Sequence, residues 1–589
     1  LGVTVTKRNP SIMVALAFYS PKGTHDSKFV GNYVSIYLVD ALKRVPGVGD
    51  VTVFGNDFGM RIWLNPEKLA ALNLTPDDIT AAINEQNLEI APGTVGGVPQ
   101  PDVQSFEYSV LTNSRLNTPD QFKNIIIRSD SAGNIIYLKD VARVELGKFS
   151  YGNNAFVEGK PATFLLIYQA PGANALETYS GITKALTELR KTFPSDIDYL
   201  IPLETVSVVK TSMKEVVITL LEALTLVVIV VFLFLQNWRA TLIPVLAIPV
   251  SLIGTFIFFV PFGFTINTLT LFAFVLAIGI VVDDAIIVVE AVQHNIDYNN
   301  MSPKDATRKA MKDISAPVIA IALILASVFI PVGFIPGIVG KLYQQFAITI
   351  AVSVIISAFV ALSLTPALCS LMLKHSKDEK AKRNFLEKFF RAFNSRFRKI
   401  TSSYTRGVSL WIRKTPYVLI LLIVLFTGLV FLFEKKPTGF IPPEDEGRLY
   451  LTYEMQEGAA TTRSVAMMQE IMSRIKDIPE LEVSGGLAGL NIISFSNKSN
   501  VGTIFIHLKP WDERKGKSHT ALSVMQKIYQ KTADIKDARI LVISPPAVPG
   551  LGRTAGFTFE LQQTTSNDDI QQFAKVAQNF VAQVNKRPE

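Results

Sequence analysis

The stretch LAIGIVVDDAIIVVE, residues 276–290, decides the fold, because it places two adjacent carboxylates, Asp283 and Asp284, inside an apolar run. Upstream of this pair, no charged side chain occurs as far back as residue 240. Uncharged apolar runs of about 18 or more residues are typical of membrane-spanning helices. A charge at the centre of such a helix costs at least about 2.5 kcal/mol and is rarely kept without a function. The aspartate pair is therefore the first candidate functional site.

Similar apolar segments recur along the chain and predict six membrane spans. Their expected bounds are 213–235, 240–261, 266–290, 314–335, 345–373 and 415–433. The composition agrees, since only 18% of the 589 residues are charged, against about 25% in soluble proteins. A single cysteine, Cys369, excludes an internal disulfide. No nucleophile–base set, metal motif or phosphate loop is evident, so we predict neither an enzyme nor a bound cofactor.

The positive charge of the chain is concentrated in one place. Residues 374–414 hold 13 Lys or Arg against three acids, a net charge of +10, whereas the whole chain carries +8. This location argues against nucleic-acid binding. Short basic loops stay in the cytoplasm, which predicts that 1–205 and 434–589 lie outside it. Because 1–205 would need translocation and no signal precedes it, we expect an additional upstream span, and hence a fragment of a longer protein.

The basic segment also has an amphipathic pattern. Phe385, Phe389, Phe393 and Phe397 recur every four residues among lysines and arginines. This spacing predicts a helix lying in the inner membrane interface, close to anionic lipid. A helix packed on protein is the alternative.

The segments outside the spans have an α+β pattern. Residues 446–554 predict strands near 449–455, 481–486, 502–508 and 539–543, with helices at 461–477 and 518–533. This β-α-β-β-α-β order is that of a split-βαβ, ferredoxin-like sandwich. Residues 1–205 alternate strands and helices as well, with Thr75-Pro76 and Thr118-Pro119 as helix starts. The Gly- and Pro-rich segment 89–113 predicts an extended loop or hairpin.

The aspartate pair has the chemistry of a proton carrier. Two neighbouring carboxylates in a low dielectric interact strongly, so the pair is able to take up and release a proton near neutral pH. The other mid-span acid, Glu222, is expected near the outer interface. A structural ion pair with a Lys or Arg is the alternative, but no such residue lies in the interior of a predicted span, so a cationic partner would come from elsewhere.

Several motifs resemble one family of membrane transporters. The sequences GFTINTLT (263–270), LAIG (276–279) and VDDAIIVVE (282–290) resemble the fourth membrane helix of resistance-nodulation-division exporters. The match is to the hydrophobe/amphiphile drug-efflux branch, whose helix carries a paired aspartate. QNWRATLIP (236–244), LTPALC (364–369) and GVGDV (47–51) fit the same family, and the resemblance covers essentially the whole chain.

This resemblance implies proton-driven efflux of amphiphilic small molecules, such as hydrophobic drugs or detergents. It also implies a homotrimer in the inner membrane of a Gram-negative bacterium, with a periplasmic adaptor and an outer-membrane channel as partners. Six of twelve membrane helices would be present, together with α+β periplasmic domains. The implied domains are a porter subdomain (1–57 and 150–205), a docking insertion (58–149), five spans (206–373), a cytoplasmic amphipathic helix (374–414), a sixth span (415–434), a second porter subdomain (443–554) and the truncated start of another (555–589).

The resemblance also implies site residues. Asp283 and Asp284 correspond to the proton-relay acids, and Phe54 and Phe505 to phenylalanines that line the deep substrate pocket. Without the resemblance, the alternative for both phenylalanines is that they are inward-facing core residues of strands. Residues 487–499 resemble a flexible loop between two pockets, where the family often has phenylalanines. This sequence has Leu487, Ile492 and Phe495 there, a departure that bears on the aromatic character and substrate range of the pocket.

Two other functions are open at this point. A heavy-metal exporter of the same superfamily would use soft ligands, for which Met467, Met468 and Met472 are candidates, although their place on one predicted helix favours a core role. A proton-driven accessory to protein translocation, or a sterol-sensing membrane protein, would lack the insertion at 58–149.

Overall fold

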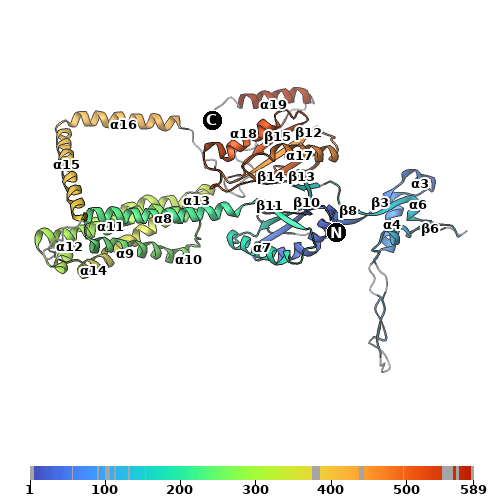
Figure 1. The fold of residues 1–589 in the computed structure, drawn as a ribbon, viewed down its shortest axis with the longest axis horizontal. Coiled ribbons are helices and arrows are strands. Elements are labelled where there is room, and N and C mark those ends of the chain that lie inside the picture. Colours follow the sequence, from blue (N-terminus) through green and yellow to red (C-terminus); the bar gives the residue numbers. More distant parts are fainter. Residues whose placement is uncertain are drawn as a thin grey trace. The chain divides into compact units, whose positions relative to one another are not determined.

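The structure is a computed structural model (Figure 1) that describes most of the chain. The described residues are 5–55, 57–88, 92–97, 99, 106–111, 115–129, 133–152, 154–374, 385–436, 444–494, 496–546, 561–564 and 569–584. They form two compact units. The first, unit 1, comprises Leu1–Val206 and Phe440–Pro588, and the second, unit 2, comprises Ser207–Gly439.

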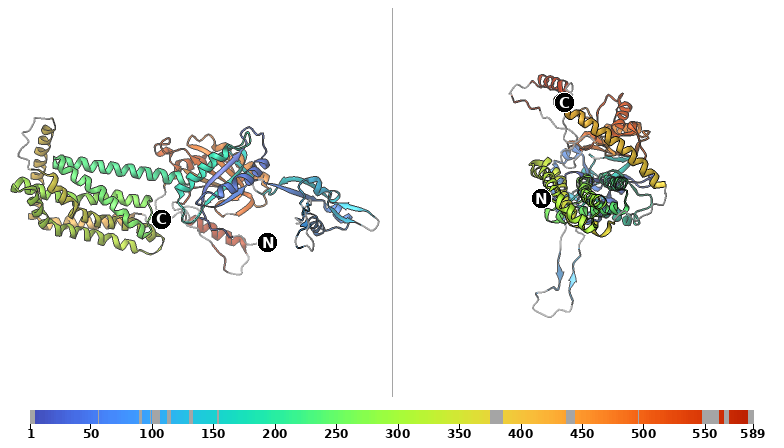
Figure 2. Two further views of the ribbon diagram at one scale, coloured as in Figure 1. Left: turned by 90° about the horizontal axis from the view of Figure 1, so that it is seen from below. Right: turned by 90° about the vertical axis from the view of Figure 1, so that its left-hand side faces the viewer.

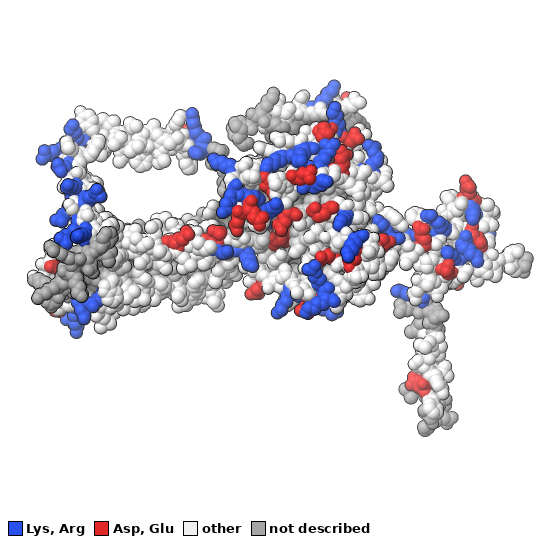
Figure 3. Space-filling view, in the orientation of Figure 1, with Lys and Arg blue, Asp and Glu red and all other residues white. Residues whose placement is uncertain are grey.

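Unit 2 is helical, and among its described residues six helices are long and apolar enough to cross a membrane. This number confirms the six predicted spans. The spans are Val206–Leu235 (α8), Trp238–Phe262 (α9 to α10), Thr268–Asn299 (α11), Pro303–Phe334 (α12 and η3), Gly340–Met372 (within α13 and α14) and Thr415–Lys435 (α16). Figure 3 shows that this unit carries little charge along most of its length and that Lys and Arg line α15.

The fifth span is present as predicted, and the structure adds that it is not one continuous helix. Helix α13 covers Gly337–Leu362, and α14 starts at Leu364 after Ser363 leaves the helical conformation (φ −120°, ψ −68°). Pro366 explains the break, since proline lacks an N–H and its ring clashes with the carbonyl four residues earlier, here that of Leu362.

Helix α11 occupies the middle of unit 2 and packs against α9, α12, α13 and α14. Small side chains permit this close packing: Ala273 of α11 and Ala240, Ala310 and Ala358 of its neighbours are buried in one cluster. The helix begins at a capping box, in which Asn267 and Thr270 each accept a hydrogen bond from the other's backbone N–H at 3.0 and 2.9 Å. The aspartate pair therefore lies on a helix that is packed against its neighbours along its length and capped at its start.

The basic segment forms a helix, α15 (Phe385–Arg413), as predicted. Its first half packs on α8: the rings of Phe390, Phe393 and Phe397 lie 5.6–5.8 Å from those of Phe232 or Phe234. The side-chain amides of Gln236 and Asn394 also exchange two hydrogen bonds, of 2.7 and 3.0 Å. For this half of α15, packing on protein therefore accounts for part of the phenylalanine stripe.

Unit 1 contains a nine-stranded antiparallel sheet in the order β11-β1-β10-β9-β13-β14-β12-β15, with β2 also paired to β10. The strands are Ile12–Tyr19 (β1), Val48–Phe54 (β2), Asn154–Val157 (β9), Lys160–Gln169 (β10), Asp198–Glu204 (β11), Arg448–Met455 (β12), Leu481–Asn491 (β13), Ser496–Leu508 (β14) and Ala538–Ile543 (β15). The main helices of its two halves are Ser27–Tyr33 (α1), Val39–Lys43 (α2), Ala175–Arg190 (α7), Thr461–Ile475 (α17) and Ala521–Thr532 (α18). A short π-helix, η1 (Val34–Leu38), joins α1 to α2.

The predicted strands and helices of 446–554 are confirmed as elements. Met467, Met468 and Met472 are buried on α17 in the core beneath β12–β14. No group of three or more His, Cys, Asp or Glu able to hold a metal occurs among the described residues. After the last strand of this sheet in the sequence, the chain forms one more helix, α19 (Ile570–Val584).

Residues 58–148 form a small α+β region with its own core. Its elements are β3 (Phe58–Leu64), α3 (Pro66–Ala71), α4 (Pro76–Gln86), β4 (Thr94–Val95), β5 (Tyr108–Ser109), α5 (Pro119–Lys123), β6 (Ile126–Ser129), β7 (Ile135–Tyr137), α6 (Leu138–Val141) and β8 (Ala142–Lys148). Thr75 and Thr118 cap α4 and α5, as predicted. Figure 2 shows β4 and β5 as paired extended strands, which agrees with a hairpin in 89–113.

Strand β9 connects the two halves of the sheet. Its Ala155–Val157 segment pairs with Lys160–Ala162 of β10, and its Asn154–Val157 segment pairs with Gly485–Ala488 of β13. The halves meet so closely that a Cβ on Gly485 would lie 2.7 Å from Cζ of Phe164 and 2.9 Å from Cβ of Pro202. Glycine is therefore required here by close approach.

We predict that Gly485→Ala destabilises unit 1 by about 1–3 kcal/mol, the usual cost of overpacking a closed site. The expected result is a lower melting temperature of the detergent-solubilised protein, followed by intrinsic fluorescence. Gly152→Ala is the matched control, because its Cβ would meet only Ser150 Oγ at 3.8 Å. Equal melting temperatures for both variants would contradict the close approach.

Candidate functional site

The aspartate pair lies on α11, and the two carboxylates face different directions. Successive helix residues are rotated by about 100°, so neighbours cannot share one face. Asp284 is buried, with 4% of its surface exposed, and accepts a hydrogen bond of 2.8 Å from Ser357 Oγ of α13. Asp283 is exposed on the adjoining face. The pair thus combines a buried, hydrogen-bonded acid with an accessible one.

Ser357 is placed to satisfy Asp284 in either protonation state. Its hydroxyl lies 2.8 Å from Asp284 Oδ2 and 3.0 Å from the carbonyl oxygen of Val281. A hydroxyl has one proton to give and can also accept. It donates to Asp284 when that acid is charged. When Asp284 carries a proton, the acid donates to Ser357, and Ser357 donates to Val281. The site can therefore gain or lose a proton without leaving an unpaired buried group.

Sequence reasoning missed Ser357, although a signal was available. Thr349, Ser353 and Ser357 recur every four residues in α13 and form a row of buried hydroxyls. Ser353 lies 3.1 Å from the hydroxyl of Thr255 on α9. In an apolar span, a row of this kind indicates a polar surface that faces other helices. The remaining mid-span acid, Glu222, is exposed on α8.

Four of the five residues predicted to bind substrate belong to one apolar cluster in unit 1. Phe505 is fully buried, Leu487 and Ile492 are buried, and Phe54 is partly buried against them. The fifth, Phe495, lies outside the described residues. The cluster lies where β10 and β13–β14 approach each other.

Aromatic neighbours surround Phe505. Its ring centroid lies 6.3 Å from that of Phe164 and 5.7 Å from that of Tyr450, the latter edge-on at 88°. Burial raises the pKa of Tyr450 above its ordinary value, so this neighbour stays uncharged. In this conformation the cluster is a closed apolar core, and a ligand would have to separate its walls to enter.

The predicted loop 487–499 is corrected by the structure. Strand β13 continues to Asn491 and β14 begins at Ser496, with Leu490 paired to Asn497 and Asn491 to Ser496. The register shifts between Ala488 and Leu490, where Gly489 has φ +99°. Glycine makes this bulge possible, and the ladder resumes beyond it. Most of the segment is therefore a hairpin.

Comparison with known proteins identifies related chains. A family model described as the AcrB/AcrD/AcrF family matches residues 1–589. Multidrug resistance protein MdtF of Escherichia coli K12 is 39% identical over 566 residues, which cover 95% of this chain and 54% of the relative. Multidrug export protein AcrF of the same strain is 39% identical over 563 residues, with coverage of 95% and 54%. Toluene efflux pump membrane transporter TtgB of Pseudomonas putida is 37% identical over 565 residues, with coverage of 95% and 53%. The chain spans about half the length of these relatives.

We predict that Ser357→Ala destabilises unit 2 by about 1–3 kcal/mol, because buried Asp284 loses its hydrogen-bond donor. Ser357→Thr keeps the hydroxyl and should lose less. The measurement is the melting temperature in detergent, with Ser327→Ala as the control, since Ser327 is exposed and bonds only within its own helix. If Ser357→Ala costs as much in an Asp284→Asn background as alone, the two side chains are not coupled.

Proposed function

Because the chain belongs to the AcrB/AcrD/AcrF family, we propose that it is part of a pump that exports amphiphilic small molecules in exchange for protons. The relatives are multidrug and solvent efflux pumps of the resistance-nodulation-division class, and this chain is a multi-pass membrane protein. The observation that carries the proposal is Asp284, a buried acid within a span whose hydrogen bond to Ser357 serves both of its protonation states.

In this mechanism Asp283 and Asp284 are the proton relay. Asp283 is accessible and exchanges protons with water or with a side chain of a neighbouring helix. Asp284 binds or releases its proton while buried inside the bundle. Since Ser357 belongs to α13, a change of protonation at Asp284 alters a contact between two helices. Proton binding is thereby able to bias helix packing, which is the requirement for coupling a proton to a conformational change.

The substrate pathway is proposed for unit 1. The strand orders β11-β1-β10-β2 and β13-β14-β12-β15 support two split-βαβ porter subdomains, at 1–57 with 150–205 and at 443–554. Residues 58–149 would be the docking insertion and 555–589 the start of a further subdomain. The cluster around Phe54 and Phe505, together with Leu487, Ile492 and Phe495, would open into a pocket when the two halves separate.

The proposed setting is the inner membrane of a Gram-negative bacterium, with unit 1 in the periplasm. A homotrimer, a periplasmic adaptor, an outer-membrane channel, and hydrophobic drugs or detergents as substrates complete the proposal. The metal-export alternative has less support, because Met467, Met468 and Met472 are core residues of α17.

For coupling, we predict that Asp283→Asn or Asp284→Asn reduces drug export to the level of cells lacking the pump. The amide keeps the shape of the side chain and removes proton exchange, so insertion and assembly should be unchanged. The measurement is drug accumulation in a pump-deficient strain that expresses the native gene. Glu222→Gln is the control and should retain export. Near-normal export by either asparagine variant would refute the relay role of that residue.

For specificity, we predict that Phe54→Ala and Phe505→Ala alter the relative export of drugs of different shape. A lost aromatic wall removes apolar contact worth about 1–3 kcal/mol for ligands that use it. Phe505→Ala should also lower stability, by about 3–5 kcal/mol. Phe18→Ala is the matched control, because Phe18 is equally buried in a different cluster. A uniform loss across drugs, parallel to that of Phe18→Ala, would indicate core residues instead.

A further inference from the structure

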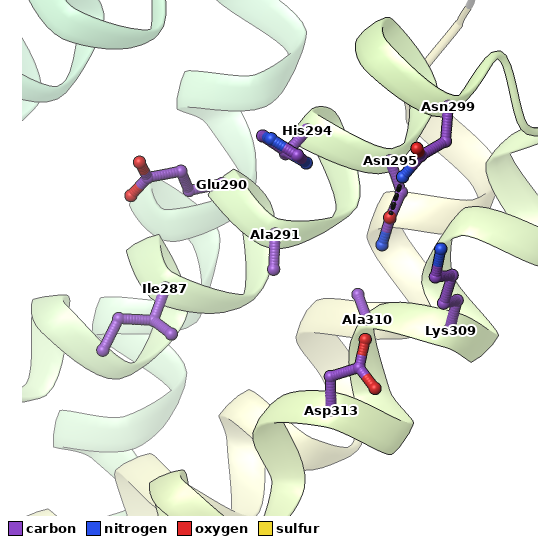
Figure 4. Close-up of a pocket in the computed structure, with 9 residues that line it drawn as sticks. All are labelled: Ile287, Glu290, Ala291, His294, Asn295, Asn299, Lys309, Ala310 and Asp313. Carbon is purple, nitrogen blue, oxygen red and sulfur yellow. Dashed lines mark hydrogen bonds between the residues drawn. The ribbon is translucent and has the colours of Figure 1, made fainter.

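A cavity of about 520 Å³ lies between α11 and α12, toward the end of α11 that follows the aspartate pair. Figure 4 shows its walls. Its lining residues are Ile287, Glu290, Ala291, His294, Asn295 and Asn299 of α11, with Lys309, Ala310 and Asp313 of α12. Neither the relay nor the substrate cluster accounts for these residues.

The cavity is aligned with Asp283 along one face of α11. Asp283, Ile287, Glu290 and His294 are spaced by four, three and four residues, which places them on a single stripe of a helix. Asp283, Glu290 and His294 are all exposed, and Ile287 is partly buried between them. At 1.5 Å per residue, Glu290 lies about 10 Å beyond Asp283 along the axis, and His294 about 6 Å further. Two or three water molecules would span the longer gap.

The chemistry of the lining suits proton transfer. Imidazole is the side chain that both accepts and donates a proton most readily near neutral pH, and a carboxylate beside it can pass a proton on. The other charged groups of the lining are Lys309 and Asp313, both from α12 (Figure 4). Asn299 donates to Asn295 at 2.8 Å. The volume accommodates on the order of ten waters at about 30 Å³ each.

We propose that this cavity is the inner leg of the proton path, connecting Asp283 to the solution on the side of the basic loops through Glu290 and His294. The proposal rests on the proton coupling proposed above. A proton leaves the Asp283 carboxyl to a water, passes along waters beside Ile287 and binds the Glu290 carboxylate. His294 then accepts it and releases it to the solution. Glu290, His294 and the waters return to their starting states, and Asp283 is left as a carboxylate that takes its next proton from the outer side. One proton has then moved from Asp283 to the solution.

Ile287 has a particular place in this path, because it is the apolar side chain between Asp283 and Glu290. Its bulk limits the number of waters that can line up between the two acids. A smaller residue at this position should hold more water and allow protons to pass without drug. Ile287 therefore provides a second test that does not depend on removing a titratable group.

The experiment uses the full-length protein, expressed from its native gene and reconstituted in liposomes with a pH-sensitive dye. Glu290→Gln and His294→Ala should each lower drug-dependent proton flux at least about tenfold, within the range that positioned acid–base groups contribute. The loss should depend on the pH at the inner face and not at the outer face. Ile287→Ala should raise proton flux in the absence of drug. Asp297→Asn is the control, since it removes an exposed acid of α11 that does not line the cavity.

Added imidazole separates a proton-transfer role from a structural one. The cavity is large enough to admit imidazole, so the His294→Ala variant should regain flux as imidazole is added, whereas a folding defect would not respond. Wild-type flux in Glu290→Gln and His294→Ala, with Asp284→Asn inactive, would overturn this inference and leave the proposed function standing. Coupled flux in Asp284→Asn would instead count against the proposed function itself.

Discussion

The central constraint on this molecule is the presence of a carboxylate inside an apolar helix bundle. Asp284 is tolerated because α13 supplies a hydroxyl to it, and α13 can approach α11 closely because small residues line their contact. A buried acid without such a donor would lose its hydration with little return. The packing of the bundle and the chemistry of the site therefore depend on the same contact, since the α11–α13 contact that packs unit 2 is also the contact that the proposed relay would use to respond to protonation.

The predicted substrate residues show a different relation between burial and function. Phe505 and Leu487 are buried as completely as any core residue of the sheet, yet their cluster joins two halves that are connected mainly through the short strand β9. An apolar surface of this kind is stable when closed and able to receive an amphiphile when open, because the same area leaves water in both cases. Burial in one conformation therefore does not distinguish a core from a pocket, and ligand-dependent measurements are needed to do so.

Local patterns predicted much of this structure. The length of the apolar runs predicted the six spans, and the capping residues Thr75 and Thr118 predicted the starts of α4 and α5. Periodicity gave the elements of 446–554. Features that depend on tertiary contact escaped prediction: Ser357 beside Asp284, and β9 beside β13, whose paired residues Val157 and Gly485 are 328 positions apart. The break at Ser363 had a local signal in Pro366, which the apolar run concealed. The loop expected at 487–499 came from family likeness, and backbone pairing across the Gly489 bulge overrode it.

The pairing of β9 with β13 also constrains how the protein is made. A ribosome adds about 5–20 residues per second, so β9 leaves it well before its partner has been synthesised. All six membrane spans, from α8 to α16, are synthesised in that interval. Until then the edge of β9 lacks this partner and the apolar cluster around Phe164 is incomplete, a state that invites aggregation. The yield of folded protein therefore depends on how well the first half of unit 1 is kept from aggregating until β13 appears, as well as on the stability of the finished sheet.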